Sequence, residues 1–157
     1  MKAKEIVFLV INSIFACLAI IFSFTKIFIE NTQLQYSIDI GTGLFELGNS
    51  AWAVFTKIFL IAILCLLVAM PILYAFARVK KDKKLWLALL ICASVAIALL
   101  VLFIVFAYET CIDKTTLGFG RSTEYKFNSA MYVFIVFSGL VMLNMFWHCI
   151  DNVKKYK

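Results

Sequence analysis

The chain has little of what a catalytic or metal site requires. It contains a single histidine, and no two of its five cysteines are separated by only two residues. Zinc sites and dithiol redox centres depend on such groupings, so the sequence predicts neither. Phosphate-binding glycine loops, nucleophile elbows, HExxH motifs and calcium loops are also missing. We therefore expect a protein that is not an enzyme and that needs no cofactor or metal.

Charged residues are scarce as well. They make up 15% of the 157 residues, whereas 64% are hydrophobic. Soluble domains average about 25% charged residues, and so short a chain could not bury this much apolar surface from water. The formal net charge is +6, but the charges form short clusters between long apolar runs and belong to no nucleic-acid-binding motif. We therefore expect lipid as the surrounding solvent and no nucleic acid as a partner.

Four apolar runs are long enough to cross a bilayer as helices, which takes about 20 residues each. Lipid offers no partner for backbone N–H and C=O groups, so each run should be helical. The first run begins like a signal peptide, but it continues past Cys17 without a small-residue cleavage site, so we interpret it as an uncleaved span. The sequence predicts an all-α membrane protein, a four-helix transmembrane bundle in one domain of residues 1–157, with spans at about 6–29, 52–79, 85–108 and 130–150.

The basic residues predict the orientation of this bundle. Lysine and arginine are enriched in short cytoplasmic loops. Here they precede the first span, fill the turn between the second and third spans, and follow the fourth span. Both termini should therefore be cytoplasmic, with outer loops at about 30–51 and 109–129 and the plasma membrane as the location. Membrane lipids are expected partners, and the attraction of the basic clusters to anionic headgroups is a secondary effect.

The first outer loop has the pattern of a strand. Apolar and polar residues alternate from Gln33 to Ile40, a period of two that is typical of a half-buried strand. We expect a turn at 41–43, antiparallel pairing with about 44–47, and a third strand within 122–127. A lone hairpin is marginal in water, so this small extracellular antiparallel β-sheet should rest on the outer ends of the helices.

A family resemblance rests on this topology and on a short motif. The segment Gly43-Leu44-Phe45-Glu46-Leu47 is similar to the Gly-Leu-Trp motif before the second span of the claudin, peripheral myelin protein and epithelial membrane protein superfamily, with Phe45 in place of the tryptophan. The four spans, the cytoplasmic ends and the longer first outer loop also resemble that superfamily. The resemblance implies a junction, adhesion or channel-accessory protein, and it marks Gly43, Leu44, Phe45 and Glu46 as candidate interaction residues.

Charged, proline and cysteine residues at the spans supply further candidates. Lys57 and Glu109 lie near the outer ends of the second and third spans, where an ion pair between them could close the bundle. Pro71 should kink the second span, because it removes one helix hydrogen bond. Cys149 lies beside the basic end of the fourth span and is a candidate for palmitoylation, with an unmodified packing role as the alternative.

Small and amide residues predict how the helices pack. Ala88, Cys92 and Ala96 recur every four residues on the third span, a spacing that lets helix backbones approach closely in lipid. Asn12 and Asn144 lie at similar depths in the first and fourth spans, so we expect them to bond directly or through a water. On the first span the face that should pack on the fourth carries four polar or small residues, namely Asn12, Ala16, Ala19 and Ser23.

The lack of chemistry and the small outer sheet together favour an interaction protein. We expect either an accessory subunit of a larger membrane complex or channel, or a claudin-like adhesion or junction component. A pore-forming or channel homo-oligomer is the alternative. The expected partner is accordingly another membrane protein or further copies of the same chain.

Overall fold

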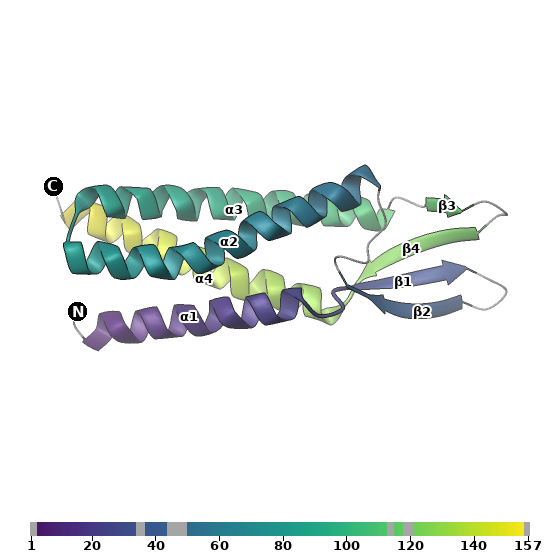
Figure 1. Ribbon diagram of the computed structural model, residues 1–157, viewed down its shortest axis with the longest axis horizontal. Coiled ribbons are helices and arrows are strands. Elements are labelled where there is room, and N and C mark those ends of the chain that lie inside the picture. The colour runs from purple at the N-terminus through teal and green to yellow at the C-terminus, as the bar shows by residue number, and fades with distance from the viewer. Residues whose placement is uncertain (1–2, 34–36, 44–49, 113–114, 118–120, 156–157) are drawn as a thin grey trace.

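The computed structural model describes residues 3–33, 37–43, 50–112, 115–117 and 121–155. It is a four-helix bundle with a small antiparallel sheet at one end, as predicted (Figure 1). The helices are α1 (Ala3–Ser23), α2 (Ala51–Lys80), α3 (Lys83–Ile112) and α4 (Ser129–Lys155). The strands are β1 (Phe28–Gln33), β2 (Ser37–Thr42), β3 (Thr115–Leu117) and β4 (Arg121–Phe127).

All four helices are long and apolar enough to cross a membrane. The 30 residues of α2 and of α3 correspond to about 45 Å of helix, more than the roughly 30 Å of a bilayer's hydrocarbon core. The outward faces are apolar too, with Ile14, Ile58, Val101 and Leu143 each more than 40% exposed. These features are consistent with an integral membrane protein.

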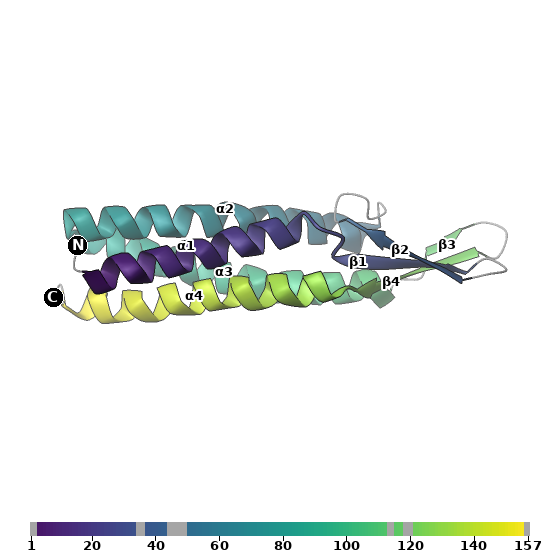
Figure 2. The ribbon, with the colours of Figure 1, turned by 90° about the horizontal axis from the view of Figure 1, so that it is seen from below.

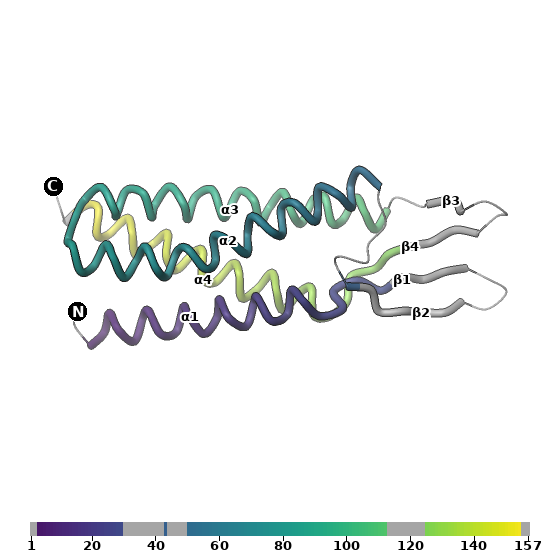
Figure 3. Tube along the Cα trace, in the orientation of Figure 1, coloured from purple at the N-terminus to yellow at the C-terminus, as the bar shows by residue number. Residues whose placement is uncertain are grey.

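The helices are arranged so that α1 lies beside α4, α4 beside α3, and α3 beside α2 (Figures 1 and 2). Large side chains from three of the helices fill the space between them, including the fully buried Tyr74, Trp86, Phe103 and Phe134. The chain trace in Figure 3 places the start of α1, the end of α4 and the α2–α3 turn at the same end of the bundle. We call this the basal end, and the opposite one the sheet end.

The α2–α3 turn is tight because only two residues separate the helices. Lys81 ends α2 in the left-handed conformation (φ 53°), and its N–H donates to the carbonyl of Ala77 at 3.0 Å. Asp82 then begins α3, since its Oδ1 accepts the N–H of Lys84 at 2.9 Å. The left-handed residue after α2 and the acidic N-cap before α3 thus provide hydrogen bonds for backbone groups that would lack a partner at the two helix ends.

The sheet has the strand order β2-β1-β4-β3, with every neighbouring pair antiparallel. Figure 1 shows it extending past the helices, away from the bundle. Its base is fixed by Asn128, whose N–H donates to the carbonyl of Ile27 at 2.9 Å and whose side-chain amide donates to that of Lys26 at 2.7 Å. Ile27 and Phe28 are fully buried there, so the sheet is anchored between the ends of α1 and α4.

The predicted third strand is confirmed as β4, but the predicted turn at 41–43 is wrong at its first two residues. Strand β2 pairs with β1, which precedes it, and Gly41 and Thr42 are strand residues paired with Ile29 and Phe28 rather than a turn. Residues 34–36 and 44–47, which the predicted hairpin pairing also used, lie outside the described residues, so that pairing stays a prediction.

The first helix is correspondingly shorter than predicted, because α1 ends at Ser23 and not near residue 29. The hydroxyl of Ser23 donates to the carbonyl of Ile20, and that of Thr25 to the carbonyl of Phe22, each at 2.7 Å. Such local bonds compete with the helical pattern. The β-branched and aromatic residues that follow favour a strand.

Candidate functional site

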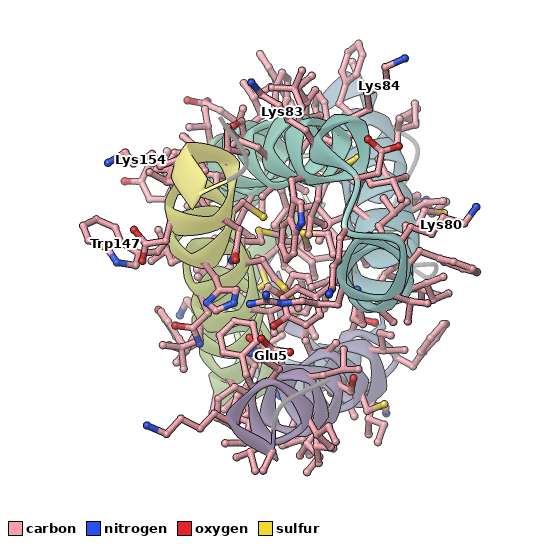
Figure 4. All side chains as sticks on the ribbon, turned by 90° about the vertical axis from the view of Figure 1, so that its left-hand side faces the viewer. Glu5, Lys80, Lys83, Lys84, Trp147 and Lys154 are labelled. Carbon is pink, nitrogen blue, oxygen red and sulfur yellow. The ribbon has the colours of Figure 1, made fainter. Side chains whose placement is uncertain are left out.

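A polar and aromatic cluster ties all four helices together at the basal end. We call it the basal cluster and define it by Glu5 and Phe8 of α1, Tyr74 and Arg78 of α2, Trp86 of α3, and His148 of α4. Figure 4 views the molecule from this end and shows Glu5 between α1 and the other helices. Among the described residues it is the place where an ion pair, a histidine and a cation over aromatic rings meet.

Arg78 is the centre of the cluster. Its Nη1 lies 3.1 Å from Oε1 of Glu5, and the two side chains are only 13% and 20% exposed. Its Nη2 lies 2.9 Å from Nε2 of His148. The guanidinium carbon also lies 5.0 Å from the ring centre of Trp86, a distance at which a cation is attracted to the aromatic ring. One side chain of α2 therefore contacts each of the other three helices.

His148 is held from several sides. Its ring stacks on that of Phe8 with centroids 4.5 Å apart, and the hydroxyl of Tyr74 lies 3.2 Å from Nε2. The backbone carbonyl of His148 accepts the side-chain amide of Asn152 at 2.6 Å. Because a guanidinium can only donate hydrogen bonds, Nε2 must be the acceptor of the contact with Arg78. The geometry therefore requires neutral His148 with its proton on Nδ1.

The predicted asparagine contact is present one to two turns deeper in the bundle. Nδ2 of Asn144 donates to Oδ1 of Asn12 at 3.5 Å, and Nδ2 of Asn12 donates to the carbonyl of Phe8 at 2.8 Å. Asn12 is 1% exposed, and Asn12, Ala16, Ala19 and Ser23 are the buried residues of α1. The face of α1 that the sequence predicted to pack on α4 is therefore the one that does.

The small-residue face predicted on α3 is rotated slightly from the observed one. Ala96 is fully buried, whereas Ala88 and Cys92 are only half-buried. The buried alanines of α3 are instead Ala93, Ala96 and Ala107. A second polar contact that the prediction missed joins α2 and α3 at the sheet end, where the buried hydroxyls of Thr56 and Thr110 lie 3.2 Å apart.

The position of Cys149 does not favour palmitoylation, which stays a prediction, because the side chain is fully buried. It packs within the core at the basal end, so an acyl-transfer enzyme could not reach the sulfur without opening the bundle. The packing role that the sequence left as an alternative is the one observed.

The other candidates lie apart from the basal cluster. Lys57 and Glu109 are half-buried near the sheet ends of α2 and α3, and an ion pair between them stays a prediction. Helix α2 continues through Pro71 and is bent along its length in Figure 1. Gly43 is half-buried, and Leu44, Phe45 and Glu46 lie outside the described residues.

The sequence contained signals for the basal cluster that were not used. Asn144, His148 and Asn152 follow one another at intervals of four, so they share one face of α4. Tyr74 and Arg78 have the same spacing on α2, but Arg78 was assigned to the basic turn because of its neighbours. When a charged residue continues a row of buried residues along one helix face, its side chain is expected to point into the bundle.

The cluster joins the four helices through an ion pair, hydrogen bonds and ring contacts. In the described part of the chain, no three His, Cys, Asp or Glu side chains are placed to hold a metal ion. The charges of Glu5 and Arg78 offset each other at 3.1 Å, and the rest of the cluster is neutral. Its geometry is that of a clamp between helices.

Comparisons with known proteins add no family to this description. No protein-family model matches the chain. No curated protein matches it either.

Proposed function

We propose that this protein binds another membrane protein and has no enzymatic activity of its own. Its role would be that of an accessory subunit of a larger membrane complex or channel, or of a claudin-like adhesion or junction component. The observation that carries the proposal is the sheet that extends past the helices in Figure 1. Among the described strands, β2 and β3 form the two edges, and an edge strand can add a strand from a partner through main-chain hydrogen bonds.

The packing of the bundle supports binding over conduction. Large side chains, including Tyr74, Trp86 and Phe103, are fully buried between the helices, so the bundle axis is filled. A pore would have to form between several copies of the chain, and this remains the alternative function.

The basal end supports an orientation with this end in the cytoplasm. In Figure 4 the side chains of Lys80, Lys83, Lys84 and Lys154 point outward from the bundle, as does Trp147. Trp147 is 71% exposed, and tryptophan on a helix surface is typical of the membrane–water interface. Lysines beyond that level can extend toward lipid headgroups, and a cytoplasmic leaflet rich in anionic lipid would attract them. We propose the plasma membrane as the location.

Photo-crosslinking from the sheet edge tests the proposed function. A photoreactive residue replaces Ser37 in β2 and, as a matched control, Val101, which is 55% exposed on α3. We expect the Ser37 probe to give one adduct with a different membrane protein in native membranes, and the Val101 probe to lack it.

Two outcomes would contradict this account. Adducts from Ser37 whose masses are whole multiples of the chain would support the homo-oligomeric pore instead. An absence of any specific adduct from positions along β2 would show that this edge does not bind a partner.

A further inference from the structure

We propose that the basal cluster is a proton-sensitive latch, in which protonation of His148 breaks its contact with Arg78 and releases the basal end of α4 from α1 and α2. The inference concerns regulation of the fold by pH and does not depend on which partner the protein binds. It rests on the 2.9 Å contact between Nη2 of Arg78 and Nε2 of His148.

The first step is that the closed cluster accepts only one protonation state of His148. Nε2 must offer a lone pair to the guanidinium, because every polar hydrogen of Arg78 is a donor. A proton on Nε2 would place two N–H groups against each other at a distance where one of them must accept. Histidine is also the side chain whose charge ordinarily changes between pH 5 and 8.

The second step is the charge balance around His148. Helix α1 contributes Glu5, which already pairs with Arg78 at 3.1 Å. Helix α2 contributes Arg78 and the Tyr74 hydroxyl, α3 contributes the uncharged indole of Trp86, and α4 contributes the neighbouring Cys149 thiol. At neutral pH the cluster sums to zero. A proton on His148 raises it to +1 and places that charge against Arg78 in a largely buried site, where like charges repel more strongly than in water.

The third step is that His148 links α4 to two other helices at this end of the bundle. Its ring stacks on Phe8 of α1 at 4.5 Å and contacts Tyr74 of α2. The next polar link between α1 and α4 is the bond between Asn12 and Asn144, which is long at 3.5 Å. Loss of the His148 contacts would therefore loosen the last turns of α4, which would then rely mainly on the packing of the buried Cys149 and Asn152.

The direction in which pH changes the stability of the closed state follows from these steps. The closed state requires neutral His148, whereas in the open state the imidazole reaches water and takes up a proton freely. The open state then binds more protons, so the closed state loses stability as the pH falls. We expect the latch to be closed at pH 7.5 and to open at pH 5.

Cys149 reports directly on the opening, because it is next to His148 and fully buried. The four other cysteines are replaced by alanine, and the rate of maleimide labelling of Cys149 is measured in lipid nanodiscs at pH 7.5 and 5.0. Each rate is divided by that of the denatured chain at the same pH, which removes the pH dependence of the thiol chemistry. We expect this ratio to rise about tenfold or more at pH 5.0, in keeping with a like-charge contact in a partly buried site.

Two variants separate His148 from other acid-sensitive groups. His148→Gln cannot take up the proton but keeps an oxygen that accepts from Arg78, so Cys149 should stay protected at both pH values. Arg78→Gln removes the repelling charge, so acid should no longer raise the labelling ratio of Cys149 above its value at pH 7.5. An unchanged ratio for the parent chain between pH 7.5 and 5.0 would overturn the proposal. So would an acid-induced rise of the same size in either variant.

Discussion

Replacing Arg78 by alanine is expected to lower the free energy of unfolding by about 3 to 5 kcal/mol, the range found when one partner of a buried ion pair is removed. The change removes the ion pair between Arg78 and the Glu5 carboxylate, which is 20% exposed and so largely shielded from water. It also removes the contact with His148 and the cation over Trp86. Unfolding by a denaturing detergent in mixed micelles measures the loss.

Lys80→Ala is the matched control for this substitution. Lys80 lies two residues further along α2, is exposed, and points away from the bundle in Figure 4, so its loss should change stability by no more than about 0.5 kcal/mol. Adding Glu5→Gln to Arg78→Ala should recover part of the loss, because the carboxylate that had paired with Arg78 is then no longer charged. Equal effects of Arg78→Ala and Lys80→Ala would contradict the clamp role of the basal cluster.

Replacing Ala96 by leucine is expected to destabilise the bundle by about 1 to 3 kcal/mol, the usual cost of overpacking. Ala96 is fully buried on the face of α3 that points into the bundle. The larger side chain would have to displace neighbouring helices or adopt a strained rotamer. The same unfolding titration measures the loss.

Ala98→Leu adds the same atoms to the exposed side of α3 and should be close to neutral in a lipid-like micelle. The difference between the two leucine variants therefore reports the packing of α3 alone. If Ala98→Leu were the more damaging of the two, the assignment of the buried face of α3 would be wrong.

The helix faces show what periodicity could predict. Asn12, Ala16, Ala19 and Ser23 follow the helical repeat and differ from their apolar neighbours in size or polarity, so the buried face of α1 was readable from the sequence. The contact with Asn144 followed from topology, because in this bundle the first and last helices are neighbours.

The sheet shows that an apolar run can contain the end of a helix and the start of a strand. The segment after Ser23 is hydrophobic enough to extend the first span, yet Phe28 and Ile29 belong to β1. The switch depends on hydroxyl groups that bond to nearby carbonyls and on pairing with β4, which lies about a hundred residues later in the chain. Hydropathy records neither effect, so residues 28–29 were assigned to the span and residues 41–42 to a turn.

Arg78 shows a different limit of sequence analysis, because its lysine neighbours suggested that it belongs to the basic turn. It stands beside four lysines, and a basic turn between spans is ordinarily a mark of topology alone. The acceptors that turn it inward, Glu5 and His148, come from the two ends of the chain. Only the fold brings them within 3.1 and 2.9 Å of the guanidinium.

We propose that the four-helix bundle spans the membrane with its sheet outside the cell and its basal end inside. Cysteine labelling on a background without native cysteines tests it most directly, with Thr42→Cys in β2 and Lys83→Cys at the α2–α3 turn. A membrane-impermeant maleimide applied to intact cells should label Thr42→Cys alone, and permeabilised cells should allow both to react. Labelling of Lys83→Cys from outside intact cells, or equal labelling of both positions there, would contradict the account.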